Sequence, residues 1–225
     1  MTRFVFVRHA ESVHNRDGVI STATPGPDLT PEGVRQSEEL AERLAGSLDA
    51  VYASPTLRAT RTAAALARRS GAPLVPLDDL RELFAGVVEG TPASEGLPRL
   101  DAGWERWMAD GALDEPVAPG GESATQVIGR LRRVVARVQQ EHPGDAVVAV
   151  VAHGGILQLA VPAVCANLPR DHGRVHWLRN VEVVEAHGDG PDLTCDRWAG
   201  APVPPGAVGP DARAAAPVAT PVAAP

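Results

Sequence analysis

The sequence contains no lysine, so all 21 of its basic residues are arginines, and they are outnumbered by 28 acidic residues. The formal charge of −7 and the absence of a basic run argue against nucleic acid or an anionic membrane as the main partner, because both bind clustered cations. An anion-binding site must therefore be built locally from a few arginines. No stretch approaches the roughly 20 apolar residues that span a bilayer. Arg3 and Arg8 interrupt the first apolar run, so we expect no signal peptide.

Cysteine is also scarce, with only Cys165 and Cys195 in the chain, and their spacing fits no metal-ligand motif. Unpaired, reduced thiols are typical of a cytosolic protein. We therefore expect a soluble, cytoplasmic protein with no metal site. The sequence leaves open whether the chain forms a homodimer.

The chain is long enough for one sizeable α/β domain, which we place at residues 1–199. Helix-capping signals at Thr30-Pro31, Ser54-Pro55 and Ser123 each begin a helical pattern, and a further helix follows residue 153. The alternation of strands and helices predicts a three-layer α/β/α sandwich with a mostly parallel central sheet. The strands of that sheet are predicted from four short apolar runs, at residues 4–7, 49–53, 74–77 and 146–152.

Three other segments depart from this alternation. Residues 180–186 and 193–198 are typical of a closing hairpin. Residues 90–121 are irregular apart from one short helix, whose Trp104 and Trp107 we expect to pack on the domain, and they form a candidate cap over a site. Residues 200–225 are almost entirely Ala, Pro, Val and Gly, which predicts a disordered tail.

Several residues suited to phosphoryl transfer follow predicted strands. Ligands of open α/β sheets bind beyond the carboxyl ends of the strands, where Arg8-His9 and His153-Gly154 lie. A neutral imidazole such as His9 can attack phosphorus and form a covalent intermediate. The forked guanidinium groups of Arg8 and Arg58 match phosphate oxygens. Glu82 follows the third strand and can hold the proton for a leaving group if burial raises its pKa.

Six segments carry a family pattern in a fixed order: Arg8-His9-Ala10-Glu11-Ser12, Leu29-Thr30-Pro31-Glu32-Gly33, Ser54-Pro55-Thr56-Leu57-Arg58-Ala59, Leu80-Arg81-Glu82, Pro119-Gly120-Gly121-Glu122-Ser123 and His153-Gly154-Gly155. Together they resemble the successive motifs of the histidine phosphatase (phosphoglycerate-mutase-like) superfamily. The resemblance covers roughly residues 3–198, so it includes nearly all of the predicted domain.

This resemblance implies a phosphoglycerate-mutase-like fold and a role for each motif residue. His9 would be the nucleophile that becomes phosphorylated, and Glu82 would act first as acid and then as base. The phosphate-binding residues would be Arg8, Arg58, His153 and Gly154, with Asn15 as an auxiliary donor. Asn15 can equally stabilise its own turn, and the sequence leaves both roles open. The resemblance implies no metal ion or other cofactor, and a small phosphorylated metabolite as substrate.

The sequence departs from the family pattern at two places. Ala10 replaces the usual glycine, which places a methyl group near the phosphate turn. Residues 18–28 do not follow the commoner pattern of a loop that often borders the substrate. The substrate therefore cannot be named from the motifs.

Hydrolysis is favoured over mutase chemistry. Mutases of this family have a longer basic and aromatic segment between the acid and the second histidine, whereas this segment is short and carries five acids, at positions 101, 105, 110, 114 and 115. Acidic side chains there would repel a second phosphate. A phosphoglycerate-mutase-type phosphotransferase and a non-catalytic phospho-ligand-binding protein are the alternatives.

The remaining arginines and histidines show no catalytic spacing. We expect Arg130, Arg132, Arg133 and Arg137 to form a solvated helix face that pairs with nearby acids. We interpret the other five histidines as surface or packing residues, with His14 the strongest exception.

Overall fold

A single mixed sheet organises the domain. The computed structural model describes residues 1–44, 46 and 48–206. In these residues the sheet has seven strands in the order β3-β2-β4-β1-β5-β6-β7, of which β3, β2, β4 and β1 run parallel and the others antiparallel. The strands are β1 (Arg3–Arg8), β2 (Ala50–Ala53), β3 (Leu74–Pro76), β4 (Val147–Ala152), β5 (Val183–His187), β6 (Thr194–Trp198) and β7 (Ala201–Pro202).

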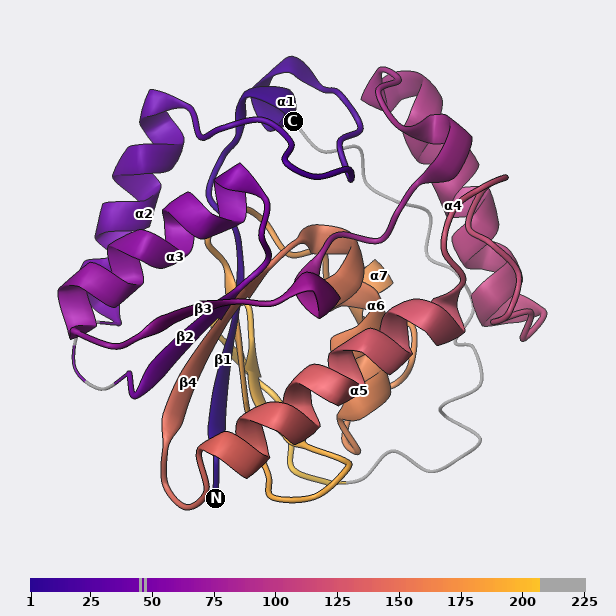
Figure 1. Cartoon of the computed structure of the whole chain (residues 1–225). Coiled ribbons are helices and arrows are strands. Elements are labelled where there is room, and N and C mark those ends of the chain that lie inside the picture. Colours follow the sequence, from indigo (N-terminus) through magenta and orange to yellow (C-terminus); the bar gives the residue numbers. More distant parts are fainter. Residues whose placement is uncertain (45, 47, 207–225) are drawn as a thin grey trace.

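Helices cover both faces of this sheet (Figure 1). Those on one face, α2 and α3, follow the first cap-and-proline signals, and Thr30 accepts a hydrogen bond from Gly33 N as the α2 cap. The helices are α1 (Val13–Asp17), α2 (Pro31–Arg43), α3 (Leu57–Ser70), α4 (Ala93–Ala109), α5 (Ala124–Glu141), α6 (Gly154–Val164) and α7 (His172–Val175), with 3₁₀ turns at Asp78–Leu80 and Gly86–Val88.

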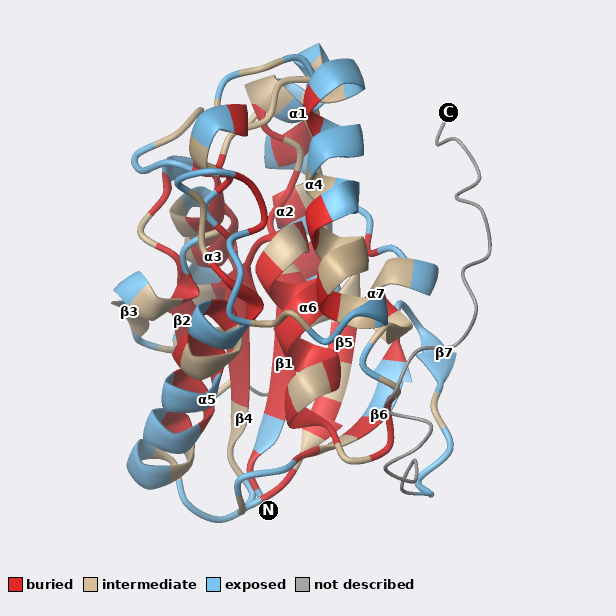
Figure 2. Cartoon of the chain, turned by 90° about the vertical axis from the view of Figure 1, so that its right-hand side faces the viewer, coloured by how far each residue is buried: buried red, intermediate tan, exposed pale blue. Residues whose placement is uncertain are grey.

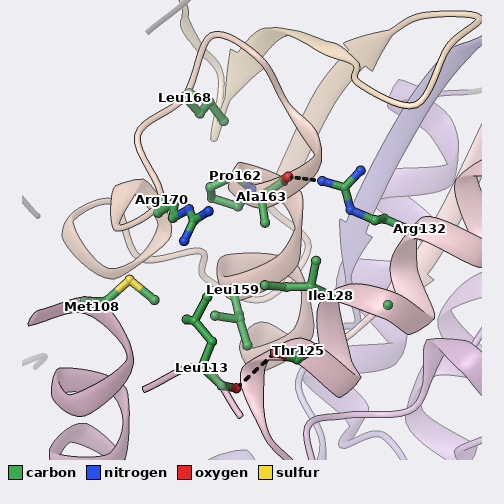
Figure 3. A pocket seen from close by; sticks show the side chains of 11 residues that line it. Met108, Leu113, Thr125, Ile128, Arg132, Leu159, Pro162, Ala163, Leu168 and Arg170 are labelled. Atoms are coloured by element: carbon green, nitrogen blue, oxygen red, sulfur yellow. Dashed lines mark hydrogen bonds between the residues drawn. The ribbon is translucent and has the colours of Figure 1, made fainter. Parts of the chain in front are cut away.

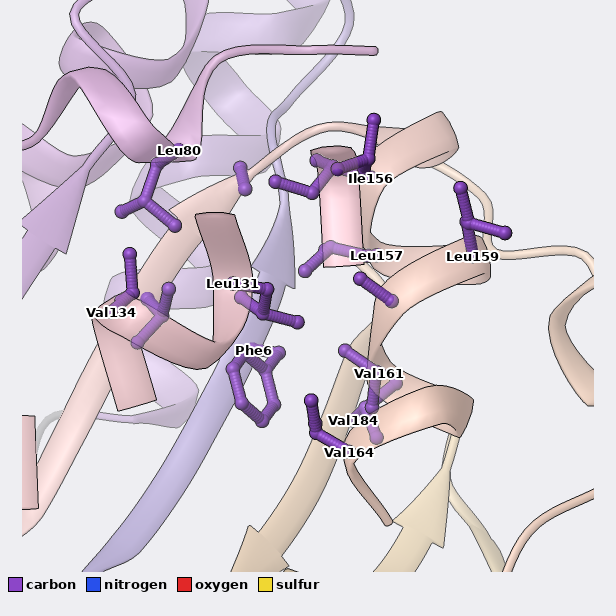
Figure 4. Packing of buried hydrophobic residues seen from close by; sticks show 14 of the residues in the cluster. Phe6, Leu80, Leu131, Val134, Ile156, Leu157, Leu159, Val161, Val164 and Val184 are labelled. Carbon is purple, nitrogen blue, oxygen red and sulfur yellow. The ribbon is translucent and has the colours of Figure 1, made fainter. Parts of the chain in front are cut away.

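Alternation along the strands divides the core between the two faces. Val5 and Val7 of β1 belong to a buried cluster with residues of α2 and α3. Phe4 and Phe6 belong to the larger cluster under α5 and α6, where Figure 4 shows Phe6 beside Leu131. Each fully buried side chain of this size stabilises the fold by about 1.5–3 kcal/mol. Burial of both sheet faces confirms the predicted α/β/α sandwich, and Figure 2 shows the buried strands between the helices.

The register of β1 and β4 brings two predicted site segments together. The strands are parallel neighbours, and Arg8 at the end of β1 lies opposite Ala152 at the end of β4. His9 and His153 are the next residues of each chain segment, and His9 N donates to Ala152 O at 3.0 Å. Both histidines therefore leave the same edge of the sheet.

The segment predicted as irregular is largely helical. α4 spans 17 residues, so the prediction of one short helix within 90–121 was wrong in extent. Its buried face includes Gly96 and Gly103, and a Cβ on Gly103 would lie 2.0 Å from Val117 O. The glycines that suggested a loop instead permit close packing of a helix. Trp107 is buried and Trp104 packs on the core, which confirms the packing expected of the two tryptophans.

The ordered chain continues beyond the predicted domain end at residue 199. β7 pairs with β6, and Pro204 O accepts a hydrogen bond from Asn167 Nδ2 at 2.9 Å. Residues 201–206 therefore complete the closing hairpin, and the predicted tail was wrong there. The rest of that predicted tail, 207–225, lies outside the described residues. Within the described part of the chain, no helix has both the length and the apolar character needed to cross a membrane.

Candidate active site

Two buried histidines lie at the centre of the candidate site. The ring centroids of His9 and His153 are 5.0 Å apart, and the rings meet edge to face at 65°. His9 is 3% exposed and His153 is fully buried. The sequence placed both residues at strand ends, and the structure brings them into contact.

The partners of His9 determine which ring nitrogen carries its proton. Nδ1 lies 2.7 Å from Ala10 O, and a carbonyl oxygen can only accept, so Nδ1 carries the proton. Nε2 lies 3.1 Å from Arg58 Nε, and a guanidinium nitrogen can only donate, so Nε2 presents its lone pair. His9 is therefore held as the tautomer in which the lone pair of Nε2 points toward Arg58.

Burial keeps both histidines neutral. The pKa of His9 is well below its usual value, first because of burial and then because Arg58 and Arg8 are positively charged. The pKa of His153 is lowered well below its usual value for the same leading reasons, burial and then Arg58. A neutral imidazole is the form that can act as a nucleophile.

Arg58 and Arg8 supply two buried positive charges. Arg58 lies in the first turn of α3, where Nε meets His9 and Nη2 donates to Ser21 O at 3.0 Å. Arg8 donates through Nη1 to Leu178 O. Burial lowers the pKa of both guanidinium groups, which the charge of Glu82 opposes. Among the described residues, neither guanidinium lies within ion-pairing distance of a carboxylate, so both charges are available to bind an anion.

Three buried nitrogens around His9 have no hydrogen-bond partner in the described structure: Arg8 Nε, Arg58 Nη1 and His153 Nδ1. Leaving such groups unpaired costs roughly 1–3 kcal/mol each, and more for charged groups. Ser54 Oγ lies 2.8 Å from His153 Nε2, and the ring proton is on Nδ1 when this hydroxyl donates to Nε2. The three nitrogens then form a set of donors suited to a phosphate.

Glu82 binds the start of α6. Its Oε2 accepts from Gly155 N at 2.9 Å, while Oε1 accepts from Ile156 N at 2.8 Å and from its neighbour Leu83 N at 2.7 Å. A carboxylate at a helix N-terminus is stabilised by the unpaired N–H groups and the helix dipole. Because α6 begins directly after His153, these bonds tie Glu82 to the strand end that carries the second histidine.

Asn15 and Gly154 lie beside these groups in different roles. Asn15 Oδ1 accepts from Ser12 N at 3.1 Å and from Ser12 Oγ at 3.0 Å, which completes the capping box of α1. Asn15 thus stabilises its own turn, and its part in phosphate binding stays a prediction. A Cβ on Gly154 would lie 3.4 Å from Arg8 Cζ, an ordinary contact distance, so α6 begins directly beside that guanidinium.

The divergent loop at residues 18–28 contacts Arg58 directly. Besides the Ser21 carbonyl, Gly26 packs on the guanidinium so closely that a Cβ there would lie 2.4 Å from Nη1. Glu89 holds this loop by accepting from Thr22 N at 2.8 Å and Ala23 N at 3.2 Å. The sequence singled out the loop but gave no signal for Glu89, whose partners lie more than 60 residues away.

Arg130 corrects the prediction of a fully solvated arginine face on α5. Arg132, Arg133 and Arg137 are exposed and lie near acids, but Arg130 is 5% exposed and points inward. Its spacing from Val127 and Val134 places it within the apolar stripe of the helix, which was the available signal.

A separate cavity lies between α4, α5 and α6 (Figure 3). Its volume is about 320 Å³, and apolar side chains such as Met108, Ile128 and Leu159 line it with Arg132 and Arg170. Arg132 donates to Ala163 O there at 2.9 Å. The lining includes neither histidine of the candidate site, so this cavity does not contain the phosphoryl-transfer groups.

Comparison with known proteins identifies the family. A model of the histidine phosphatase superfamily (branch 1) matches residues 4–200. The chain belongs to this superfamily. A metal-independent phosphoserine phosphatase of Arabidopsis thaliana is 31% identical over 161 residues, which are 70% of this chain and 66% of that protein. This match confirms the predicted family and supports phosphomonoester hydrolysis.

Two further members extend the comparison. A 2-carboxy-D-arabinitol-1-phosphatase of Triticum aestivum is 32% identical over 163 residues, which are 71% of this chain and 32% of that protein. The solved structure of a mycobacterial glucosyl-3-phosphoglycerate phosphatase superposes with a TM-score of 0.72 at 25% identity, covering 88% of this chain and 98% of that chain. The predicted phosphoglycerate-mutase-like fold is therefore confirmed.

Proposed function

We propose that this histidine phosphatase hydrolyses a small phosphomonoester through a covalent phosphohistidine at His9. The observation that carries the proposal is the fixed tautomer of His9, because Nε2 presents a lone pair beside three unpartnered buried donors. Backbone and arginine groups supply the charge stabilisation that a metal ion would supply in other phosphatases, so no metal is required.

In the first step His9 Nε2 attacks phosphorus and the bond from phosphorus to the ester oxygen breaks. Arg58 Nε holds the Nε2 lone pair in the free protein, so Arg58 must transfer this hydrogen bond to a phosphate oxygen when substrate binds. The same movement frees the nucleophile and neutralises the developing charge. The unpartnered nitrogens of Arg8 and His153 bind the remaining equatorial oxygens.

Glu82 delivers the proton to the leaving oxygen. Two N–H groups occupy both acceptor positions of Oε1, whereas Oε2 has one partner and one free position. The transferable proton is therefore carried on Oε2. In the second step the same atom removes a proton from the water that attacks the phosphohistidine, which returns His9 and releases phosphate.

A phosphorylated acid is the substrate class we propose. The three relatives are named for phosphoserine, 2-carboxy-D-arabinitol 1-phosphate and glucosyl-3-phosphoglycerate, each of which bears a carboxylate. Mutase chemistry is disfavoured because residues 101–115, between Glu82 and His153, carry five acids, whose charge would repel a second phosphate. A screen that compares phosphoserine and phosphoglycerate with alkyl phosphates that have no carboxylate tests the carboxylate requirement.

Rapid-quench labelling tests the covalent step. Brief mixing with ³²P-labelled substrate followed by acid-free denaturation should leave a phosphoryl group that is labile in acid and stable in base, as expected of a phosphoramidate. His9→Ala should lose both the label and turnover, whereas His153→Ala should still label slowly because the nucleophile remains. An active enzyme that never carries label would show direct attack by water instead, and label on His153 would reverse the two roles.

A further inference from the structure

A buried ion pair lies behind Glu82, outside the phosphate pocket. Arg130 of α5 and Glu122 form a bidentate ion pair, in which Arg130 Nε donates to Glu122 Oε1 at 3.0 Å and Arg130 Nη2 donates to Glu122 Oε2 at 2.9 Å. Their side chains are only 7% and 22% exposed. Burial makes such an ion pair a poor source of net stability, so its hydrogen bonds to neighbouring groups indicate its role better than its charge does.

The remaining donors of Arg130 bind the backbone that leads to the proposed acid. Nη1 donates to Asp79 O at 2.6 Å and to Arg81 O at 2.9 Å, and Nη2 lies 3.5 Å from Glu82 O. The guanidinium therefore holds three carbonyl groups of one short segment, in addition to the Glu122 carboxylate.

Glu122 holds the same segment from the other side of Glu82. Its Oε2 accepts from Phe84 N at 2.9 Å, and its own N–H donates to Phe84 O at 3.0 Å. Residues 79–84 include no strand or α-helix that could fix the backbone, apart from the end of one 3₁₀ turn. The ion pair is thus hydrogen-bonded to the backbone both before and after Glu82.

We infer that Arg130 and Glu122 are positioning residues that place the Glu82 carboxylate at the leaving oxygen of the substrate. This inference rests on the proposed function, in which Glu82 is the acid. Only a planar fork can reach one carboxylate and several carbonyls together, so lysine cannot replace Arg130. Loss of these hydrogen bonds lets Glu82 move, and a displacement of about 1 Å can lower the rate on the order of 10²-fold.

The test compares two leaving groups in Arg130→Lys. A nitrophenolate leaves without protonation, whereas an alkoxide requires a proton, so only the alkyl substrate reports on the acid. We measure kcat/KM, which reports the transfer of the phosphoryl group to His9 and not the later hydrolysis in which Glu82 acts as base. We expect kcat/KM for phosphoserine or another alkyl phosphate to fall roughly 10- to 100-fold. kcat/KM for p-nitrophenyl phosphate should change less than about threefold, and inhibition by inorganic phosphate should be unchanged, because the anion pocket is intact. Amide exchange at Gly155 and Ile156, which donate to Glu82, should become faster.

Three comparisons make the outcome decisive. Arg133→Gln breaks an exposed ion pair to Asp79 on the same helix and should leave the ratio of the two rates unchanged. Glu122→Gln serves as a second, nearly isosteric variant if Arg130→Lys does not fold. In a Glu82→Gln background, Arg130→Lys should add little further loss on the alkyl substrate, because both changes act through one group.

Two failures are distinguishable. If Glu82→Gln lowers both rates equally, the proposed acid role itself is wrong. If Glu82→Gln shows the leaving-group dependence but Arg130→Lys and Glu122→Gln lower both rates equally, the pair is only structural and the inference is overturned.

Discussion

Gly155→Ala is a one-methyl change that should disable the proposed acid while leaving the Glu82 residue itself unsubstituted. A Cβ at this position would lie 2.7 Å from Glu82 Oε1, 3.2 Å from Cδ and 3.3 Å from Oε2, whereas ordinary contacts begin at 3.4 Å. Since Oε1 is bonded to Ile156 N and Oε2 to Gly155 N, the carboxylate must move away from both donors. We expect a loss of about 10²-fold on alkyl phosphates, because the proton carrier is displaced by a fraction of an ångström to 1 Å.

The effect of Gly155→Ala on stability has a definite sign. Alanine in place of glycine in a helix normally stabilises by roughly 0.5–1 kcal/mol. Losing a hydrogen bond to a charged group costs about 1.5–3 kcal/mol, so the variant should be less stable by a net ~0.5–2.5 kcal/mol when one bond is lost and by more when both are lost. Gly129→Ala in α5 is the matched control, since a Cβ there has no neighbour nearer than 3.8 Å and should raise the melting temperature without changing turnover. A Gly155→Ala protein that is stabilised and fully active on both substrates would refute the reasoning.

Three other predictions concern the phosphate pocket. Gly26→Ala should weaken competitive inhibition by phosphate roughly tenfold or more, because the alanine Cβ would displace Arg58 Nη1 and the φ of +66° at this position disfavours alanine. An unchanged inhibition constant would show that the loop adjusts without moving Arg58. Burial lowers the pKa of His9 and His153, so below about pH 6.5 the unfolded chain binds more protons than the folded one. The contribution of these histidines to stability should therefore be constant above that pH and fall as the pH decreases, with a shallower fall in His153→Gln. Thermal unfolding from pH 8 to pH 5 measures the slope in both proteins. Exhaustive chelation should leave turnover unchanged, and activity that is lost with chelator and restored by a divalent ion would contradict the proposed pocket.

The sequence was sufficient for the residues that follow regular elements. His9 and His153 follow buried strands and Arg58 lies in the first turn of α3, so local periodicity placed them at one edge of the sheet. The parallel direction of β1 and β4 follows from the fold class, whereas their adjacency and register, which bring the two histidines together, come from the structure.

The supporting residues could not be placed in the same way. Arg130 shares α5 with three exposed arginines, and its carbonyl partners lie about 50 residues earlier in an irregular segment. Glu89 is likewise distant from the loop that it holds. Nothing local in the sequence indicates such contacts, because they depend on how separate segments pack. The long helix α4 was missed for a related reason, since Gly103 packs on the backbone of Val117 and Gly96 packs on side chains outside the helix.

Backbone groups determine the protonation of both reacting side chains. The Ala10 carbonyl fixes the proton of His9 on Nδ1, and two N–H groups on Glu82 Oε1 leave Oε2 as the atom that would carry the proton in the proposed mechanism. Arg8 and Arg58 are also held by carbonyl groups, so their buried charges stay available for an anion. A chain with an overall negative charge can thus bind a phosphate dianion, because the positive charge is concentrated in a buried site where water screens it least. The same arrangement requires a precise backbone behind the acid, which is the role that the Arg130 and Glu122 pair would fill.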